Sequence, residues 1–447
     1  MKIRMFLAGL SALAITSLTG PTMAKDYFLA SGRWDNVVLV IDLEKALDPA
    51  NDGTANAVVN RLRVTPDIDA TGSGVKDTIA SGQPIVIAIA PDGRRAYVVG
   101  HSGWAKPEDA KAFQHGHPGS VTVIDLAKAL DPKLNGTLGA VEAFIESEGF
   151  GATGFAFLPD GRHAALAHAE AKGDEDGGRH INIVDLTTNK VVHKVEQAYG
   201  KPGFPCPPDP IPHRAPDMTF GCFPDTNGVA VSPLEGGLIF TANGGTDDIS
   251  VIDVGLALAG KPGAEKARIP VQMGGFGIAA SPDGKLIAHA SREDARTGKE
   301  GNTVSIIDVA KAASDPGRAE IARVLVGTDD AAVATRPFVA AFHPDGKRII
   351  SSQFRANNID VIDVDAAIAG KPAIIKRIAL KTMSDAPSRP RGIAITADGK
   401  YAAITGAPKG EAGSSMVWIV DLASYEVRGR VTGIGNESYM IGAFQAN

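Results

Sequence analysis

Residues 281–309 read SPDGKLIAHASREDARTGKEGNTVSIIDV, and this stretch decides the fold because both of its parts recur along the chain. Its second part is an apolar strand that ends in an aliphatic-Asp-aliphatic triplet. The seven copies carry their aspartates at Asp42, Asp125, Asp185, Asp253, Asp308, Asp363 and Asp421. Its first part is a pair of short apolar segments joined by an Asp-Gly turn. The turn returns at Asp92, Asp160, Asp283, Asp345 and Asp398, with a looser copy at Glu235. A fixed-order repeat of this size is typical of a propeller or a solenoid.

Each full unit predicts four short strands. The apolar, β-branched segments suit antiparallel strands, and the Asp-Gly pair supplies the positive φ that a two-residue hairpin requires. We expect the triplet aspartate to accept hydrogen bonds from backbone N–H groups in the turn after it, which is a structural role.

The two ends of the repeat indicate how the ring closes. The first unit lacks its first strand, and a lone final strand at 439–444 lies where an eighth such strand would fall. Pairing the two ends completes a blade and removes an exposed sheet edge. The sequence therefore predicts an all-β, seven-bladed propeller of four-stranded antiparallel blades.

The first residues match a secretory signal. Lys2 and Arg4 precede an apolar run from Met5 to about Leu18, and Thr22-Met23-Ala24 is a small-residue cleavage pattern. We expect residues 1–24 to be a signal peptide and 25–447 to be one propeller domain in the periplasm or outside the cell.

The charge and hydropathy of the chain bear on its partners. The net charge of -6 becomes -8 without Lys2 and Arg4, which disfavours an extended nucleic-acid surface. No later segment has eighteen consecutive apolar residues, so we expect no membrane span. The two cysteines, Cys206 and Cys222, lie in one Pro-rich segment, and in an exported chain they predict a disulfide.

The repeat resembles the YVTN-type β-propeller family over essentially the whole mature chain. The resemblance rests on Ser281–Lys285 with Val304–Asp308, and on Phe240–Asn243 with Ile249–Asp253. Proteins similar to this family include binding proteins, lactonases and the propeller subunits of quinoprotein amine dehydrogenases. Asp26–Ala30 also looks like the start of an amine dehydrogenase β-chain.

The longer loops all fall on the face opposite the Asp-Gly turns, so we expect the site there, around the mouth of the central channel. Aligning the units selects residues that end the second strand or enter the first. The candidate ligand-binding residues are Gln83, His168, Asp225, Asn227, Asn243, Arg336, Gln353, Arg389, Arg391 and Glu437.

Arg336 and Arg389 occupy matching positions in adjacent units. Two guanidiniums that converge there could hold a carboxylate or a phosphate. The alternative is that each arginine pairs with an acidic residue of a neighbouring blade.

Histidines in the loops are candidate metal ligands. His101, His115, His117 and His213 could assemble a zinc or copper site, although their spacing matches no established metal signature and loop histidines are usually solvated.

Three functions are compatible with these observations. The first is a non-catalytic propeller that binds a small anionic ligand or a periplasmic protein partner. The second is a lactonase-like hydrolase, with the two arginines holding a carboxylate and His168 or Glu437 as general base. The third is a metal-binding or redox-partner propeller.

Overall fold

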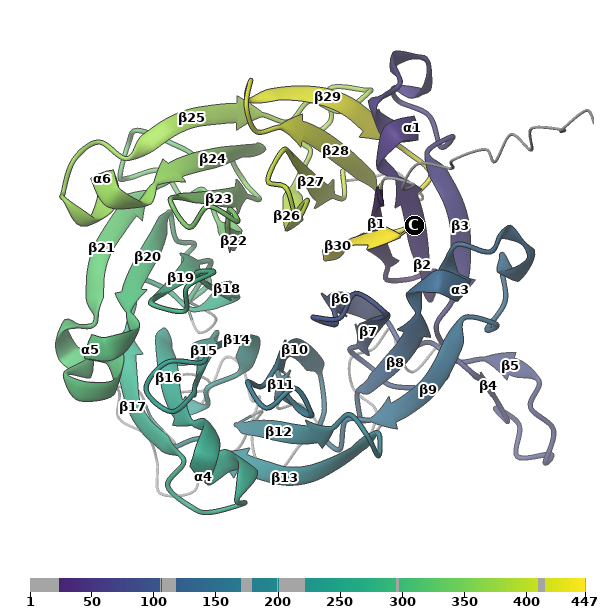
Figure 1. The fold of residues 1–447 in the computed structure, drawn as a ribbon, viewed down its shortest axis with the longest axis horizontal. Coiled ribbons are helices and arrows are strands. Elements are labelled where there is room, and N and C mark those ends of the chain that lie inside the picture. Colours follow the sequence, from purple (N-terminus) through teal and green to yellow (C-terminus); the bar gives the residue numbers. More distant parts are fainter. Residues whose placement is uncertain are drawn as a thin grey trace, which may run out of the picture.

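The computed structural model describes residues 24–104, 106, 118–169, 179–198, 200, 222–294, 297–408 and 415–446. Within these residues, seven four-stranded sheets stand around a ring as blades (Figure 1). Neighbouring strands in each blade are antiparallel. The predicted all-β, seven-bladed propeller is confirmed.

Blades 1 to 6 follow one another along the chain, each with its first strand innermost. Blade 1 holds β6 (Pro84–Ile89), β7 (Arg95–Gly100), β8 (Ser120–Asp125) and β9 (Val141–Glu146). Blade 2 holds β10 (Ala152–Phe157), β11 (His163–His168), β12 (His180–Asp185) and β13 (Lys190–Glu196). Blade 3 holds β14 (Thr226–Ser232), β15 (Leu238–Asn243), β16 (Asp248–Asp253) and β17 (Glu265–Pro270). Blade 4 holds β18 (Gly275–Ala280), β19 (Leu286–Ser291), β20 (Thr303–Asp308) and β21 (Glu320–Leu325). Blade 5 holds β22 (Pro337–Phe342), β23 (Arg348–Gln353), β24 (Asn358–Asp363) and β25 (Ile374–Ala379). Blade 6 holds β26 (Pro390–Ile395), β27 (Tyr401–Gly406), β28 (Met416–Asp421) and β29 (Glu426–Val431).

Blade 7 joins the two ends of the described chain. It contains β1 (Lys25–Gly32), β2 (Val37–Asp42), β3 (Val58–Arg63) and, as its innermost strand, β30 (Ile441–Ala446). The strands β1 and β30 pair antiparallel, with Tyr27 opposite Phe444. The expected closure is therefore confirmed, with the last strand beginning two residues later than predicted.

The triplet aspartates end the third strand of each blade, and each caps the helix or turn that comes next in the chain. Asp253 Oδ1 accepts a hydrogen bond from Leu256 N at 2.7 Å, at the start of α4 (Val254–Leu258). Equivalent caps begin α1 (Leu43–Leu47), α3 (Leu126–Ala129), α5 (Val309–Ser314) and α6 (Val364–Ile368). Asp185 and Asp421 bond to turns instead. An N-cap of this kind stabilises by about 1 kcal/mol, so the structural role predicted for these residues is confirmed.

The Asp-Gly turns adopt the backbone that their sequence predicts. The turn glycines Gly93, Gly161, Gly284, Gly346 and Gly399 have φ between 67° and 73°, a region where glycine carries no steric cost. The helices that follow the triplet aspartates lie on this same face, since the first residues of α3, α4, α5 and α6 bond to the backbone beside the turns, so this face is not plain as expected.

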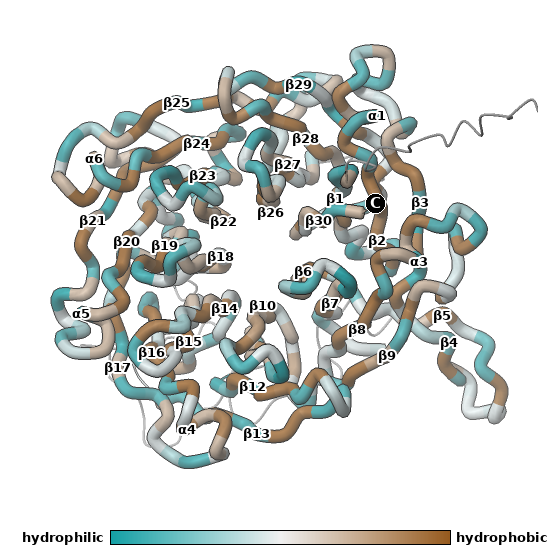
Figure 2. The backbone as a smooth tube through the Cα atoms, in the orientation of Figure 1, coloured by the Kyte–Doolittle hydropathy of each residue, from teal (hydrophilic) through white to brown (hydrophobic). Residues whose placement is uncertain are grey.

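The hydrophobic core lies between blades rather than at the ring axis. Among the described residues, six of the seven buried clusters combine strands of two adjacent blades, and the seventh, between blades 5 and 6, also includes Phe276 of blade 4. Apolar positions accordingly follow the strands all around the ring (Figure 2). Because each blade is packed on both sides, the innermost strands and the loops beside them are held rigidly around the axis.

One hairpin departs from the ring. Strands β4 (Asp67–Ile68) and β5 (Thr78–Ile79) project outward beside blade 1 (Figure 1). Short 3-10 turns lie at Pro49–Asn51, Pro132–Leu134 and Pro316–Arg318. None of the described helices is long and apolar enough to cross a membrane.

Candidate functional site

A set of strained residues marks one end of the ring axis. The residue that leads into the innermost strand has a left-handed backbone in five blades, although it is not glycine. These residues are Gln83, Asp225, Arg336, Arg389 and Glu437, with φ between 47° and 55°. Each such residue costs of order 1 to 3 kcal/mol relative to a relaxed backbone, and such strain clusters at functional sites. Glycine would adopt this backbone without the strain energy. We therefore infer that the side chains at these five positions have a role of their own.

Backbone hydrogen bonds explain why the conformation recurs. The carbonyl of Gln83 accepts from His101 N at 3.1 Å, and that of Arg336 accepts from Phe354 N at 3.0 Å. The loop before the first strand is thereby fixed to the loop after the second. The ring thus holds these side chains in place by its main chain.

A cavity of about 230 Å³ lies at this end of the axis. Its lining comes from blades 1, 2, 3, 4 and 7 and comprises Arg33, Ile85, His101, Thr153, Ala169, Asp225, Asn227, Gly244, Gly274, Gly275, Phe276, Arg292, Glu293 and Tyr439. Polar and charged side chains outnumber apolar ones in this lining, so the cavity suits a small polar or charged ligand better than an apolar one.

Beside the cavity the described residues form an arginine cluster, which we define by its ion pairs and shared ring contacts. It contains Arg33, Arg292, Arg336, Arg355, Arg389 and Arg391, with Glu293, Glu300 and Glu437. Each carboxylate serves two guanidiniums. Within the described part of the chain, the cluster thus brings together six guanidiniums and three carboxylates.

The centre of the cluster is the ring of Phe354. The guanidiniums of Arg336, Arg389 and Arg391 lie 5.3 Å, 5.4 Å and 5.5 Å from its centroid. Cation–π contacts of this kind contribute about 0.5 to 2 kcal/mol each. Arg336 and Arg389 therefore lie against the same aromatic ring.

The two arginines differ in their acidic partners. Arg336 Nη1 donates to Glu300 Oε1 at 3.0 Å, and its other terminal nitrogen pairs with Glu293. This is the neighbouring-blade pairing that the sequence left open. Arg389 has no ion pair with any described carboxylate, and burial together with the positive charges of Arg355, Arg391 and Arg336 lowers the pKa of Arg389. Within the described part of the chain, Arg389 is therefore the arginine of the cluster without a carboxylate at ion-pair distance, although the charge of Glu437 acts on it from farther away.

Glu437 pairs with two other arginines of the cluster. Its carboxylate accepts from Arg391 Nη2 at 3.0 Å, from Arg33 Nη1 at 3.4 Å and from Trp34 Nε1 at 2.6 Å. Burial opposes ionisation, but the two guanidiniums and these donors outweigh it and lower the pKa of Glu437. A carboxylate held in this way is a poor proton acceptor at neutral pH.

The other candidate ligand-binding residues lie either at the cavity or in the buried interior. Asp225 and Asn227 line the cavity, and Gln83 supports it by accepting from Arg33 Nη2 at 2.7 Å. His168, Asn243 and Gln353 are instead buried in the interior, each with at most 1% of its surface exposed.

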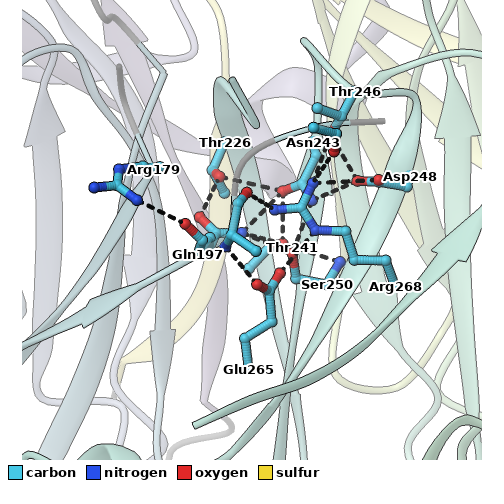
Figure 3. A network of polar contacts seen from close by, with 12 residues as sticks. Arg179, Gln197, Thr226, Thr241, Asn243, Thr246, Asp248, Ser250, Glu265 and Arg268 are labelled. Carbon is cyan, nitrogen blue, oxygen red and sulfur yellow. Dashed lines mark hydrogen bonds and ion pairs between the residues drawn. The ribbon is translucent and has the colours of Figure 1, made fainter. Parts of the chain in front are cut away.

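Asn243 belongs to a buried polar network in blade 3 (Figure 3). Its amide nitrogen donates to Asp248 Oδ1 and to Ser250 Oγ, and its oxygen accepts from Thr241 Oγ1. Burial raises the pKa of Asp248 against the opposing charge of Arg268, 3.4 Å away. We assign this network to stability, because its members bond to one another.

Several site residues were not selected from the sequence. Arg33 and Arg292 each follow the aligned position by one or two residues, and Phe276 and Tyr439 read as ordinary strand residues. The signal for the arginines was present, since both lie directly after the second strand of a blade.

Other predictions fall outside the described residues. His115, His117, His213 and Cys206 lie there, as do residues 1–23 of the expected signal peptide. Cys222 is fully buried, and its disulfide with Cys206 stays a prediction. His101 lines the cavity, and the described residues contain no group of three potential metal ligands.

Comparisons with known proteins place the fold. No family model matches the chain, and no curated relative does either. Three solved structures are similar. Hydrazine synthase of Kuenenia stuttgartiensis is 19% identical, with a TM-score of 0.50 over 79% of this chain and 80% of that one. A functionally unknown protein from Desulfotomaculum acetoxidans is 14% identical, with a TM-score of 0.57 over 94% and 99%. The β-propeller domain of Myceliophteria thermophila Cps50 (Swd1) is 12% identical, with a TM-score of 0.53 over 82% and 92%. At these identities the similarity shows the propeller fold alone.

Proposed function

We propose that this propeller binds a small anionic ligand at the mouth of its central channel and performs no chemistry on it. The observation that carries the proposal is the arginine cluster, in which Arg389 lacks a carboxylate among the described residues and every carboxylate is shared. A half-buried guanidinium among other cations gains more from an anion than an exposed one, because water screens it less. We further propose that the chain belongs to the YVTN-type family, as its repeats suggest, and works in the periplasm or outside the cell.

The hydrolase alternative draws less support from the geometry. It needs a general base beside the guanidiniums, and the lowered pKa of Glu437 makes that carboxylate a weak base. His168, the other candidate base, is buried in the interior. Neither of the two candidate bases therefore suits a hydrolase, whereas the cations suit binding.

The test is calorimetric titration with a panel of small anions, namely acetate, benzoate, sulfate and phosphate. Arg389→Met removes the positive charge while keeping an unbranched side chain. The matched control is Arg318→Met, because Arg318 lies on the outer rim with 87% of its side chain exposed. We expect at least one anion to bind, and its affinity to fall in R389M, because the variant removes one of the positive charges beside the cavity, although Arg389 is not among the residues that line it.

Arg336→Met is a less informative variant because it would leave Glu293 and Glu300 short of a partner. The proposal fails if no anion in the panel binds, or if R389M and R318M bind equally well.

A further inference from the structure

The cavity has one aromatic wall. Phe276 and Tyr439 both line it, and their ring centroids are 6.1 Å apart. Phe338 packs behind them, 4.8 Å from Phe276 and 5.8 Å from Tyr439. Aromatic rings attract one another at such distances in edge-to-face or tilted arrangements. Phe276 and Tyr439 thus form the aromatic wall of the cavity, and the buried ring of Phe338 supports both.

This wall is held in place before any ligand arrives. The hydroxyl of Tyr439 accepts from Arg33 Nη1 at 3.1 Å, and the guanidinium of Arg391 lies 4.2 Å from the Tyr439 centroid. Phe276 is 6% exposed and packs in the core of blades 5 and 6. Rings that are already fixed lose little entropy on binding, so they favour affinity for a ligand that matches them.

A cation borders the aromatic wall. Arg292 lines the cavity and lies 5.4 Å from the Phe338 centroid. Its ion pair is with Glu293 at 2.8 Å, a carboxylate that Arg336 also uses. Burial and the nearby charges of Arg336 and Arg391 lower the pKa of Arg292. The charge of Arg292 is thus incompletely balanced at the point where the wall begins.

Size and charge limit the ligand further. The volume of about 230 Å³ lies below the range of about 300–1,000 Å³ for drug-sized pockets. The carboxylates of Glu293 and Asp225 also line the cavity. They would repel a second negative charge, so a monoanion suits the lining better than phosphate.

We infer that the ligand is a small aromatic monocarboxylate, with its ring against Phe276 and Tyr439 and its carboxylate facing Arg292. The inference rests on the proposed function and adds the chemical class. An edge-to-face contact with the wall favours an aromatic ring over a saturated one of similar size. A planar, singly charged carboxylate matches the fork of one guanidinium.

The test compares four probes by calorimetric titration of the full chain: benzoate, cyclohexanecarboxylate, inorganic phosphate and benzylammonium. We expect benzoate to bind about two- to tenfold more tightly than cyclohexanecarboxylate, which is the ratio expected from an aromatic contact of ~0.5–1.5 kcal/mol. Phosphate and benzylammonium should bind more weakly than either.

Variants separate the ring contact from the charge. Phe276→Leu should remove the preference for benzoate over cyclohexanecarboxylate while keeping the affinity for the latter. Arg292→Met should weaken both acids, and R318M should change neither. Circular dichroism and the melting temperature of each variant establish that it is folded.

The outcomes distinguish this inference from the proposed function. If the two ring acids bind equally, or if phosphate binds best, the site takes anions but the aromatic class is wrong. If no anion binds, or if benzylammonium binds best, both proposals fall.

Discussion

Tyr27 and Phe444 stack across the closure of the ring, with centroids 5.5 Å apart and planes inclined by 24°, although they come from opposite ends of the described chain. Their strands pair residue by residue, and Phe444 is 5% exposed within the core between blades 7 and 1. The contact fastens the last strand to the first.

Phe444→Ala should therefore lower the free energy of unfolding by about 3–5 kcal/mol, the usual cost of removing a buried phenyl group. Urea denaturation followed by circular dichroism measures it. Val75→Ala, in the projecting hairpin with 62% of Val75 exposed, is the control and should change little. Equal effects of the two substitutions would show that the closure contributes no more than a surface residue.

Arg389 allows backbone strain to be separated from function, because its φ is 48°. Arg389→Gly should leave stability within about 1 kcal/mol of the parent or raise it, since glycine adopts this conformation freely. Arg389→Val should be less stable than Arg389→Gly by about 1–3 kcal/mol, because a branched side chain is strained there.

Both substitutions remove the same charge, so both should lose anion affinity. Urea denaturation gives the stability of each variant, and calorimetric titration gives its anion affinity. If the glycine and valine variants were equally unstable, the backbone at position 389 would not be strained by a side chain.

The buried side chain of His289 should make the stability of the folded protein depend on pH. It is fully buried, neither ring nitrogen bonds to a described residue, and burial, with a smaller contribution from the charge of Arg323, lowers the pKa of His289 to about 3. In the unfolded chain the His289 imidazole binds a proton below about pH 6.5, whereas in the folded protein it does so only near pH 3. The free energy of unfolding is therefore highest above pH 6.5 and falls as the pH falls toward 3. Between pH 7.5 and 5 the loss should be roughly 2 kcal/mol.

His289→Gln should remove most of that slope. Carboxylates whose pKa is lowered, such as Asp398 at about 2, lose their contribution only at lower pH and do not obscure this window. Urea denaturation at several pH values makes the comparison, and identical slopes in the parent and the variant would contradict the prediction.

The blade 3 network should respond unequally to removal of its two charges. Arg268→Met leaves Asp248 buried without its cation and should cost about 3–5 kcal/mol. Asp248→Asn should cost less, because Arg268 keeps Glu265 at 2.9 Å and the carbonyl of Gly200 at 3.1 Å.

The double variant, R268M with D248N, should recover part of the loss, since no buried charge is then unpaired. Thermal unfolding ranks the three proteins. A double variant less stable than R268M alone would show that the charge of Asp248 is not the source of the cost.

The architecture could be predicted because its information is local and repeated. Seven aspartate triplets and the Asp-Gly turns specify strands and hairpins, and their number gives the blades. Arg336 and Arg389 could be located by aligning units, because the main chain of each blade places the same position at the axis.

The details of the site could not be predicted, because they depend on side-chain direction and on loops. Successive residues of a strand point to opposite faces. Asn243 and Gln353 are buried, whereas Arg292, one residue beyond the aligned Ser291, reaches the cavity. The partners of Arg336 come from the irregular loop that carries Glu293 and Glu300, whose path no repeat specifies.

The shared blade also sets an order of assembly. A ribosome makes the chain from one end, and β1 must wait for β30 before blade 7 has its innermost strand. The segment just before β30 carries Glu437 and Tyr439, which hold Arg33 and Arg391. The pocket is therefore completed only after the other six blades have been made, and a polypeptide that stopped before this segment would lack both the closure of the ring and the residues that hold its cations.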